Sequence, residues 1–219
     1  MASEETAATE GLKKSRLSKT GILIICFLVF SFGLSTFIVV RGSWADTTAR
    51  IPTSSGEGII SQLYLGPDGR KEVRCSAILD YPPEEVWSVI TDYQHFSEIF
   101  SAKLWSMKLT KIEQEQPGRF HMVGEVNSKF GDWPVDVHIN HLESSEKYVA
   151  SWDEPGGDIK VNRGSWTLSP AGAGKTLVVY SLQSEVARCP NFFINYVLLA
   201  ELKPVVKAVQ IRLASENKR

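Results

Sequence analysis

The stretch DYPPEEVWSVITDY at residues 80–93 contains a change from strand to helix. Pro82 and Pro83 suit a helix start, because the amides of the first turn have no partner within the helix and a proline loses nothing there. Glu84 and Glu85 follow, where the helix dipole favours negative charge. The apolar stripe of this helix consists of Val86, Trp87, Val89 and Ile90. The stretch therefore predicts a short helix that packs one face on a core directly after a strand.

Alternating apolar and polar residues predict strands on both sides of this helix. Residues 59–65 and 71–80 flank the turn sequence GPDG at 66–69, which favours a hairpin. A second short helix is expected at residues 93–100, and further strands after it. These strands lie near residues 104–115, 119–129, 133–143, 148–154, 158–169 and 175–187. The short turns between them predict an antiparallel meander.

A long helix is expected at the end of the chain, over residues 191–216. Apolar residues recur there at spacings of three and four, which is typical of one continuous apolar face. These residues are Phe192, Tyr196, Leu199, Leu202, Val206, Val209 and Leu213. Pro204 lies inside the helix and is expected to kink it. A curved sheet around this helix needs either side chains or a cavity between the two.

Residues 21–40 form an apolar segment of twenty residues without a charge. At ~1.5 Å per residue, a helix of this length spans a hydrocarbon core ~30 Å thick. Basic residues are concentrated before the segment rather than after it. They are Lys13, Lys14, Arg16 and Lys19, whereas Arg41 and Arg50 are the only basic residues among the twenty that follow the segment. We therefore expect residues 1–20 in the cytoplasm, one transmembrane helix at 21–40, a linker at 41–58, and a domain at 59–219 outside the cytoplasm.

The apolar segment also allows a second interpretation, a cleaved signal sequence. Ser43, Trp44 and Ala45 have the small–x–small pattern of a signal-peptidase site, so cleavage after Ala45 would release a secreted domain. Cleavable signals usually have apolar regions of about 7–15 residues and a shorter polar lead than residues 1–20. The length favours an uncleaved anchor, which makes the membrane itself an expected partner.

The composition limits the remaining classes of function. The chain has 219 residues, a length that corresponds to about one domain. Lys and Arg total 24 and Asp and Glu total 25, so no basic surface for nucleic acid is expected. Three cysteines are too few for a scaffold built on disulfides.

Two motifs and the closing helix resemble a known superfamily over residues 70–215. The motifs are residues 80–93 and GSWTLSP at 164–170, the latter followed by residues 176–180. They resemble the START-like (SRPBCC, Bet v 1-like helix-grip) superfamily, in particular its polyketide cyclase/dehydrase and coenzyme Q-binding group. The chain departs from many of these relatives at Phe100 and Ser101, where they have a proline.

The resemblance implies an α+β helix-grip fold, in which a curved antiparallel sheet of about seven strands grips the C-terminal helix around an apolar cavity. It also implies a ligand such as a sterol, lipid, quinone or polyketide. In this fold the first and last strands can be neighbours, which leaves two alternatives for Cys75 and Cys189: a disulfide, or two buried thiols.

No catalytic or metal-binding constellation is expected from the motifs. The sequence GAGKT at 172–176 has Ser169 where a phosphate loop needs glycine, so it is interpreted as a hairpin turn. His138 and His141 are three residues apart on a predicted strand and therefore point to opposite faces. With His95 and His121 isolated, we expect four surface or structural histidines and no metal site. No nucleophile motif is present, and no cofactor is expected.

Aromatic and long apolar side chains are the best candidates for a ligand site. Tryptophan offers a large apolar face and one polar group, which suits a ring-bearing or isoprenoid ligand. If a cavity exists, the expected lining is Phe100, Trp105, Met107, Met122, Trp152, Tyr196 and Leu199.

These features favour membrane-anchored binding, transport or sensing of a hydrophobic small molecule. Two alternatives remain open. The first is a cyclase or dehydrase, which requires a histidine or carboxylate with a perturbed pKa in the cavity. The second is an interaction module whose interior is filled by its own side chains.

Overall fold

The computed structural model describes residues 50–66, 68–100, 105–128, 131–156 and 158–216. These residues all fall within one compact unit, Asp46–Arg219. The predicted transmembrane segment at 21–40 and the cleavage position at Ala45 lie outside the described residues. Within the described part of the chain, no helix has the length and apolar character needed to cross a bilayer.

The elements follow the predicted order closely. The first half of the chain contains η2 (Ser55–Glu57), β1 (Ile60–Leu65), β2 (Lys71–Leu79), α2 (Pro83–Ile90), η3 (Tyr93–His95) and α3 (Phe96–Ile99). The second half contains β3 (Trp105–Gln116), β4 (Arg119–Ser128), β5 (Gly131–Glu143), β6 (Tyr148–Asp153), β7 (Ile159–Pro170), β8 (Thr176–Val186) and α4 (Asn191–Glu216). The helix start at Pro83, with Glu84 and Glu85 in its first turn, is confirmed.

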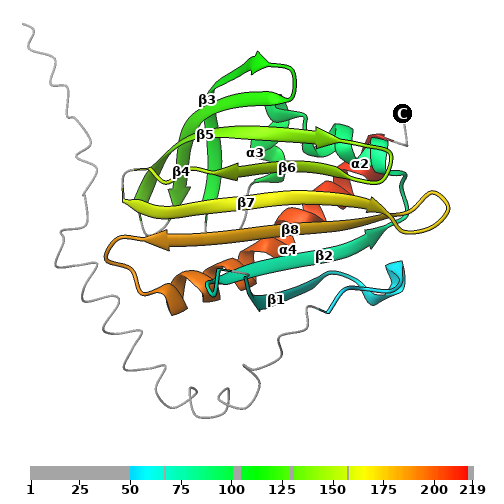
Figure 1. Ribbon diagram of the computed structural model, residues 1–219, viewed down its shortest axis with the longest axis horizontal. Helices are drawn as coiled ribbons and strands as arrows, with labels where there is room; N and C mark the ends of the chain where they lie inside the picture. Colours follow the sequence, from blue (N-terminus) through cyan, green and yellow to red (C-terminus); the bar gives the residue numbers. More distant parts are fainter. Residues whose placement is uncertain (1–49, 67, 101–104, 129–130, 157, 217–219) are drawn as a thin grey trace, which may run out of the picture. The chain divides into compact units, whose positions relative to one another are not determined.

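The strands form one antiparallel sheet in the order β1-β2-β8-β7-β6-β5-β4-β3 (Figure 1). The α+β class and the antiparallel meander are confirmed. The sheet has eight strands rather than about seven. The additional strand is β1, which pairs with β2 from Ile60 opposite Ser76 to Leu65 opposite Lys71. It forms one edge of the sheet, and β3 forms the other.

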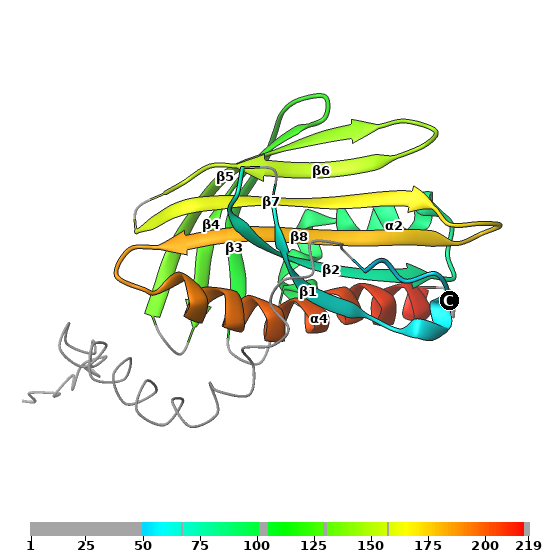
Figure 2. The ribbon, with the colours of Figure 1, turned by 60° about the horizontal axis from the view of Figure 1, so that its bottom comes forward.

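One face of the curved sheet packs on α4, α2 and α3 (Figures 1 and 2). Side chains alternate between the two faces of a strand, so every second residue of β2, β7 and β8 points towards α4. The core cluster includes Val73 and Cys75 from β2 and Val205 from α4, all with an exposed fraction of 0%. Burial of this apolar surface is the main favourable contribution to folding.

The buried face of α4 differs from the predicted stripe in its first turns. The prediction is confirmed at Leu202, Val206, Val209 and Leu213, which are buried. It is wrong at Phe192 and Tyr196, which are 56% and 70% exposed. Asn195 and Leu198 are buried instead. Each lies one residue before a predicted position, and one residue corresponds to a rotation of about 100° around a helix.

The two described cysteines are not joined to one another. The strands β2 and β8 are neighbours, but Cys75 lies opposite Tyr180, and Cys189 follows the end of β8. Burial raises the pKa of the Cys75 thiol to about 12. This thiol therefore stays protonated at neutral pH and is no candidate nucleophile.

Candidate functional site

A groove of about 680 Å³ lies between α4, β2 and the segment that leads into β1. Its lining consists of Ser55, Gly58, Ile59, Ala77, Ile78, Lys203, Pro204, Lys207 and Gln210. The strand β1 begins at Ile60, opposite Ser76, so the last residues of β2 are not paired with it. The groove opens at this end of the sheet, beside the C-terminal half of α4.

The groove combines apolar walls with two cations. Ile59, Ala77 and Ile78 line the side formed by the sheet, and Pro204 lies opposite them on α4. Lys203 and Lys207 are exposed and one helical turn apart, so both side chains are on the same side of the helix. The Lys207 ammonium donates a hydrogen bond to Gln210 Oε1 at 2.8 Å. Such a surface suits a molecule with an apolar body and a negatively charged or polar head.

None of the predicted lining residues is among the described residues that line this groove. Phe100 and Met122 are buried in the core, and Met107, Trp152 and Leu199 are half-buried against it. Tyr196 is exposed on α4. Trp105 begins β3, and its side chain lies outside the described part. The prediction followed aromatic character, whereas the groove is lined by aliphatic residues and lysines. In the sequence, the spacing of Lys203 and Lys207 on the predicted helix is the one pattern that could have indicated this lining.

The interior between sheet and helix contains a cluster of aromatic rings. The Trp166 and Tyr180 rings stack with centroids 4.1 Å apart. The Phe100 ring meets the Trp166 ring edge-on at 6.3 Å. Trp152 Nε1 donates to Asn162 Oδ1 at 3.1 Å. Trp166 Nε1, by contrast, is buried without a hydrogen-bond acceptor among the described residues. An unpaired buried donor of this kind is costly to the folded state.

His141 is the histidine that faces the interior. Tyr93 Oη lies 2.5 Å from His141 Nε2, and the rings of Trp87 and Phe120 pack against the imidazole at 4.9 and 4.7 Å. Burial lowers the pKa of His141, although the nearby Glu143 opposes this shift. A lowered pKa is what the enzyme alternative requires. However, His141 is enclosed by aromatic rings and is not among the described residues of the groove. The geometry fits a structural histidine.

The neutral state of His141 predicts a pH dependence of stability. Its pKa is below 6.5 in the folded protein and near 6.5 in the unfolded chain. Below pH 6.5 the unfolded chain therefore binds a proton that folded His141 does not, and the free energy of unfolding falls as the pH is lowered. We expect this slope to be smaller in His141→Gln than in wild type, measured by urea unfolding at several pH values. An unchanged slope in His141→Gln, or an equal change in the exposed His95→Gln, would contradict this assignment.

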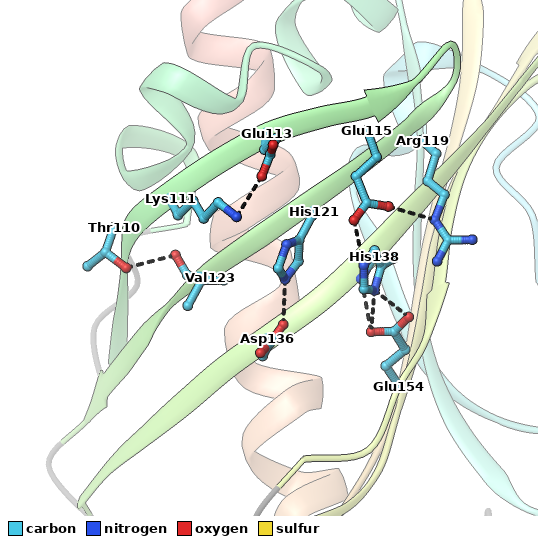
Figure 3. A network of polar contacts seen from close by, with 10 residues as sticks. All are labelled: Thr110, Lys111, Glu113, Glu115, Arg119, His121, Val123, Asp136, His138 and Glu154. Carbon is cyan, nitrogen blue, oxygen red and sulfur yellow. Dashed lines mark hydrogen bonds and ion pairs between the residues drawn. The ribbon is translucent and has the colours of Figure 1, made fainter.

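A network of polar residues lies on the opposite face of the sheet (Figure 3). His121 precedes the buried Met122 in β4, so its side chain points away from α4. His121 lies directly opposite His138 of β5, whereas His138 and His141 point to opposite faces as predicted. The hydrogen bond to Glu154 raises the pKa of His138. Spacing in the sequence relates residues along one strand, whereas the pairing of His121 with His138 depends on the register of two strands.

The eight-stranded sheet and the helix along its concave face define a START-like helix-grip domain. The chain belongs to the polyketide cyclase/dehydrase and lipid transport family, whose model matches residues 70–215. The GAGKT sequence covers the turn between β7 and β8, and its last residue, Thr176, begins β8, as the hairpin interpretation predicts.

Several solved structures share this fold. A STAR-related lipid transfer protein from Xanthomonas axonopodis matches with a TM-score of 0.56 and 16% identity, covering 72% of this chain and 94% of that chain. Human StAR-related lipid transfer protein 5 matches with a TM-score of 0.60 and 9% identity, covering 89% of this chain and 99% of that chain. Human STARD10 matches with a TM-score of 0.60 and 13% identity, covering 97% of this chain and 86% of that chain. At these identities the likeness shows the fold alone. The comparison with curated proteins gives no match.

Proposed function

We propose that this protein binds and carries, or senses, a hydrophobic small molecule such as a lipid, quinone or polyketide while tethered to a membrane. The observation that carries the proposal is the groove of about 680 Å³ with its aliphatic walls. Family membership and the lipid transfer proteins of the same fold support this ligand class.

The two lysines narrow the ligand to an amphipathic molecule. Its apolar part would lie on Ile59, Ile78 and Pro204, and its head would lie near Lys203 and Lys207. An ammonium group attracts a carboxylate or phosphate most strongly where protein partly excludes water. An anionic lipid or a fatty acid therefore fits the groove better than a hydrocarbon without a polar group.

The membrane tether is the second part of the proposal. Residues 21–40 would remain in the bilayer, and residues 41–58 would connect them to a domain outside the cytoplasm. The exposed aromatic residues Phe192 and Tyr196 lie one turn apart on α4 and suit the interface of a bilayer. Release after Ala45 is the alternative. N-terminal sequencing of the protein from the membrane fraction distinguishes them, since a chain that starts at Asp46 would contradict the tether.

Native mass spectrometry tests ligand binding on the fragment Asp46–Arg219, which contains the whole core cluster. We expect the fragment to retain a lipid after exposure to a lipid extract. Ile59→Asp should lose most of it, because the substitution places a charge in an apolar wall of the groove; a loss of about 1.4 kcal/mol already corresponds to tenfold in affinity.

Leu65→Asp is the matched control, since Leu65 lies at the other end of β1, is 49% exposed and is not part of the groove. An empty wild-type fragment would overturn ligand binding by this domain. Equal lipid retention by Ile59→Asp and Leu65→Asp would place the ligand elsewhere than in the groove.

A further inference from the structure

Three strands bring metal-ligating side chains together on the face of the sheet opposite α4 (Figure 3). His121 of β4 and His138 of β5 are direct cross-strand partners, and their rings stack with centroids 4.5 Å apart and an angle of 10°. Glu115 comes from β3. One possible ligand atom from each of these residues lies within 4.8 Å of the other two.

An irregularity in β3 places Glu115 in this group. Gln114 pairs with Phe120 and Gln116 pairs with Arg119, so Glu115 is an extra residue between two paired positions. Such a bulge redirects a side chain relative to a regular strand. The carboxylate of Glu115 reaches His138, with Oε1 3.2 Å from Nε2. Its other oxygen accepts a hydrogen bond from Arg119 Nε at 3.1 Å, which holds the carboxylate in place.

Glu154 orients His138 from the other side. Its two oxygens lie 2.9 and 3.1 Å from His138 Nδ1, and one also accepts a hydrogen bond from the His138 backbone amide. A carboxylate at Nδ1 favours the tautomer in which Nε2 is available as a ligand, and metal-binding histidines typically have such a partner. On His121 the orienting carboxylate is at the other nitrogen: Asp136 Oδ1 lies 2.7 Å from His121 Nε2, which leaves Nδ1 as the nitrogen for a metal.

The charges around the histidines favour a cation. Four carboxylates belong to the network, namely Glu113, Glu115, Asp136 and Glu154. The cations are Lys111 at 2.6 Å from Glu113 and Arg119 beside Glu115. Two negative charges therefore remain without a basic partner when both histidines are neutral. The His121 and His138 side chains are 18% and 24% exposed, so an ion can reach them from solvent.

We propose that Glu115, His121 and His138 bind a divalent transition-metal ion of the zinc class. Two imidazole nitrogens and one carboxylate oxygen are a ligand set that Zn²⁺ accepts, with the fourth position open to water. The ion joins β3, β4 and β5 on the face remote from the groove. The site and the groove share no residue.

Calorimetric titration of the full chain, without an affinity tag, with Zn²⁺ tests the site. We expect one ion per chain and a midpoint of thermal unfolding that rises with Zn²⁺, because an ion that binds only the folded state stabilises it. His121→Ala and His138→Ala should abolish both effects. Glu154→Gln, which removes only the orienting carboxylate, should weaken binding about 10–100-fold. His95→Ala is the matched control, since His95 is exposed and contacts Asp92 outside the network.

Co²⁺ provides a second measurement on the same proteins, since its visible absorption reports coordination by nitrogen and oxygen. Thermal unfolding without metal shows whether each variant is folded. If a histidine variant is not folded, Glu115→Gln is used in its place to remove a metal ligand. No Zn²⁺ binding by the wild type, or weak binding that His121→Ala and His138→Ala leave unchanged, would overturn the proposal. An equal loss of Zn²⁺ binding in His95→Ala would also overturn the proposal.

Discussion

Leu202→Ala is expected to lower the free energy of unfolding by about 2–5 kcal/mol. Leu202 lies in the middle of α4 with an exposed fraction of 0%, and it belongs to the core between the helix and the sheet. The substitution removes buried apolar surface and leaves a cavity that the surrounding strands close only in part. Urea unfolding of the fragment Asp46–Arg219 measures the loss.

Ile211→Ala is the matched control for Leu202→Ala. Ile211 lies on the same helix and is 60% exposed, so the same kind of truncation should change stability by only about 0.5 kcal/mol or less. Similar losses for both variants would mean that α4 does not pack on the sheet through Leu202. That result would contradict the helix-grip arrangement itself.

Gly164→Ala is expected to displace the Trp152 ring. A β-carbon at position 164 would lie 2.2 Å from Trp152 Cζ2, which is far closer than two carbon atoms can approach. Trp152 is half-buried and donates to Asn162, so moving the ring breaks this bond and disturbs the neighbouring stack. Overpacking of this kind typically costs about 1–3 kcal/mol. Urea unfolding and the tryptophan fluorescence of the folded fragment should both change.

Gly156→Ala provides the comparison for this prediction. No atom lies within 4 Å of a β-carbon at position 156, so the added methyl group meets open space. A stability and fluorescence equal to wild type in Gly164→Ala would show that Trp152 does not lie over Gly164. The glycine of the GSWTLSP motif would then have no packing role.

The groove and the polar network lead to different functional consequences. The groove lies where α4 meets the last residues of β2, which β1 does not pair with, and its proposed ligand contacts aliphatic side chains and lysines. The network lies on the other face of the sheet and depends on β3, β4 and β5. Lipid binding and metal binding can therefore be lost separately, by Ile59→Asp in one case and by His138→Ala in the other.

The order and type of the elements follow from local sequence patterns. The spacing of three and four over residues 191–216 predicts α4 with the observed bounds, because a long amphipathic helix repeats its signal many times. Pro83 with Glu84 and Glu85 similarly predicts the start of α2. Alternation and turns also indicate eight strands, although the resemblance to relatives favoured about seven. These patterns depend only on interactions between residues that are close to one another in the sequence.

The tertiary structure decided which of these residues meet. Tyr196 continues the apolar spacing of the helix but is exposed, whereas the polar Asn195 beside it is buried, so the amphipathic pattern alone misplaces the buried face in these turns. The pairing of His121 with His138, the bulge at Glu115 and the position of Cys75 opposite Tyr180 depend on strand register. Register is set by which face of the sheet is buried in the core, since a slip of one residue would exchange its two faces. The stretch at residues 80–93 therefore determines a strand followed by a helix, while contacts between distant segments place the groove and the histidines.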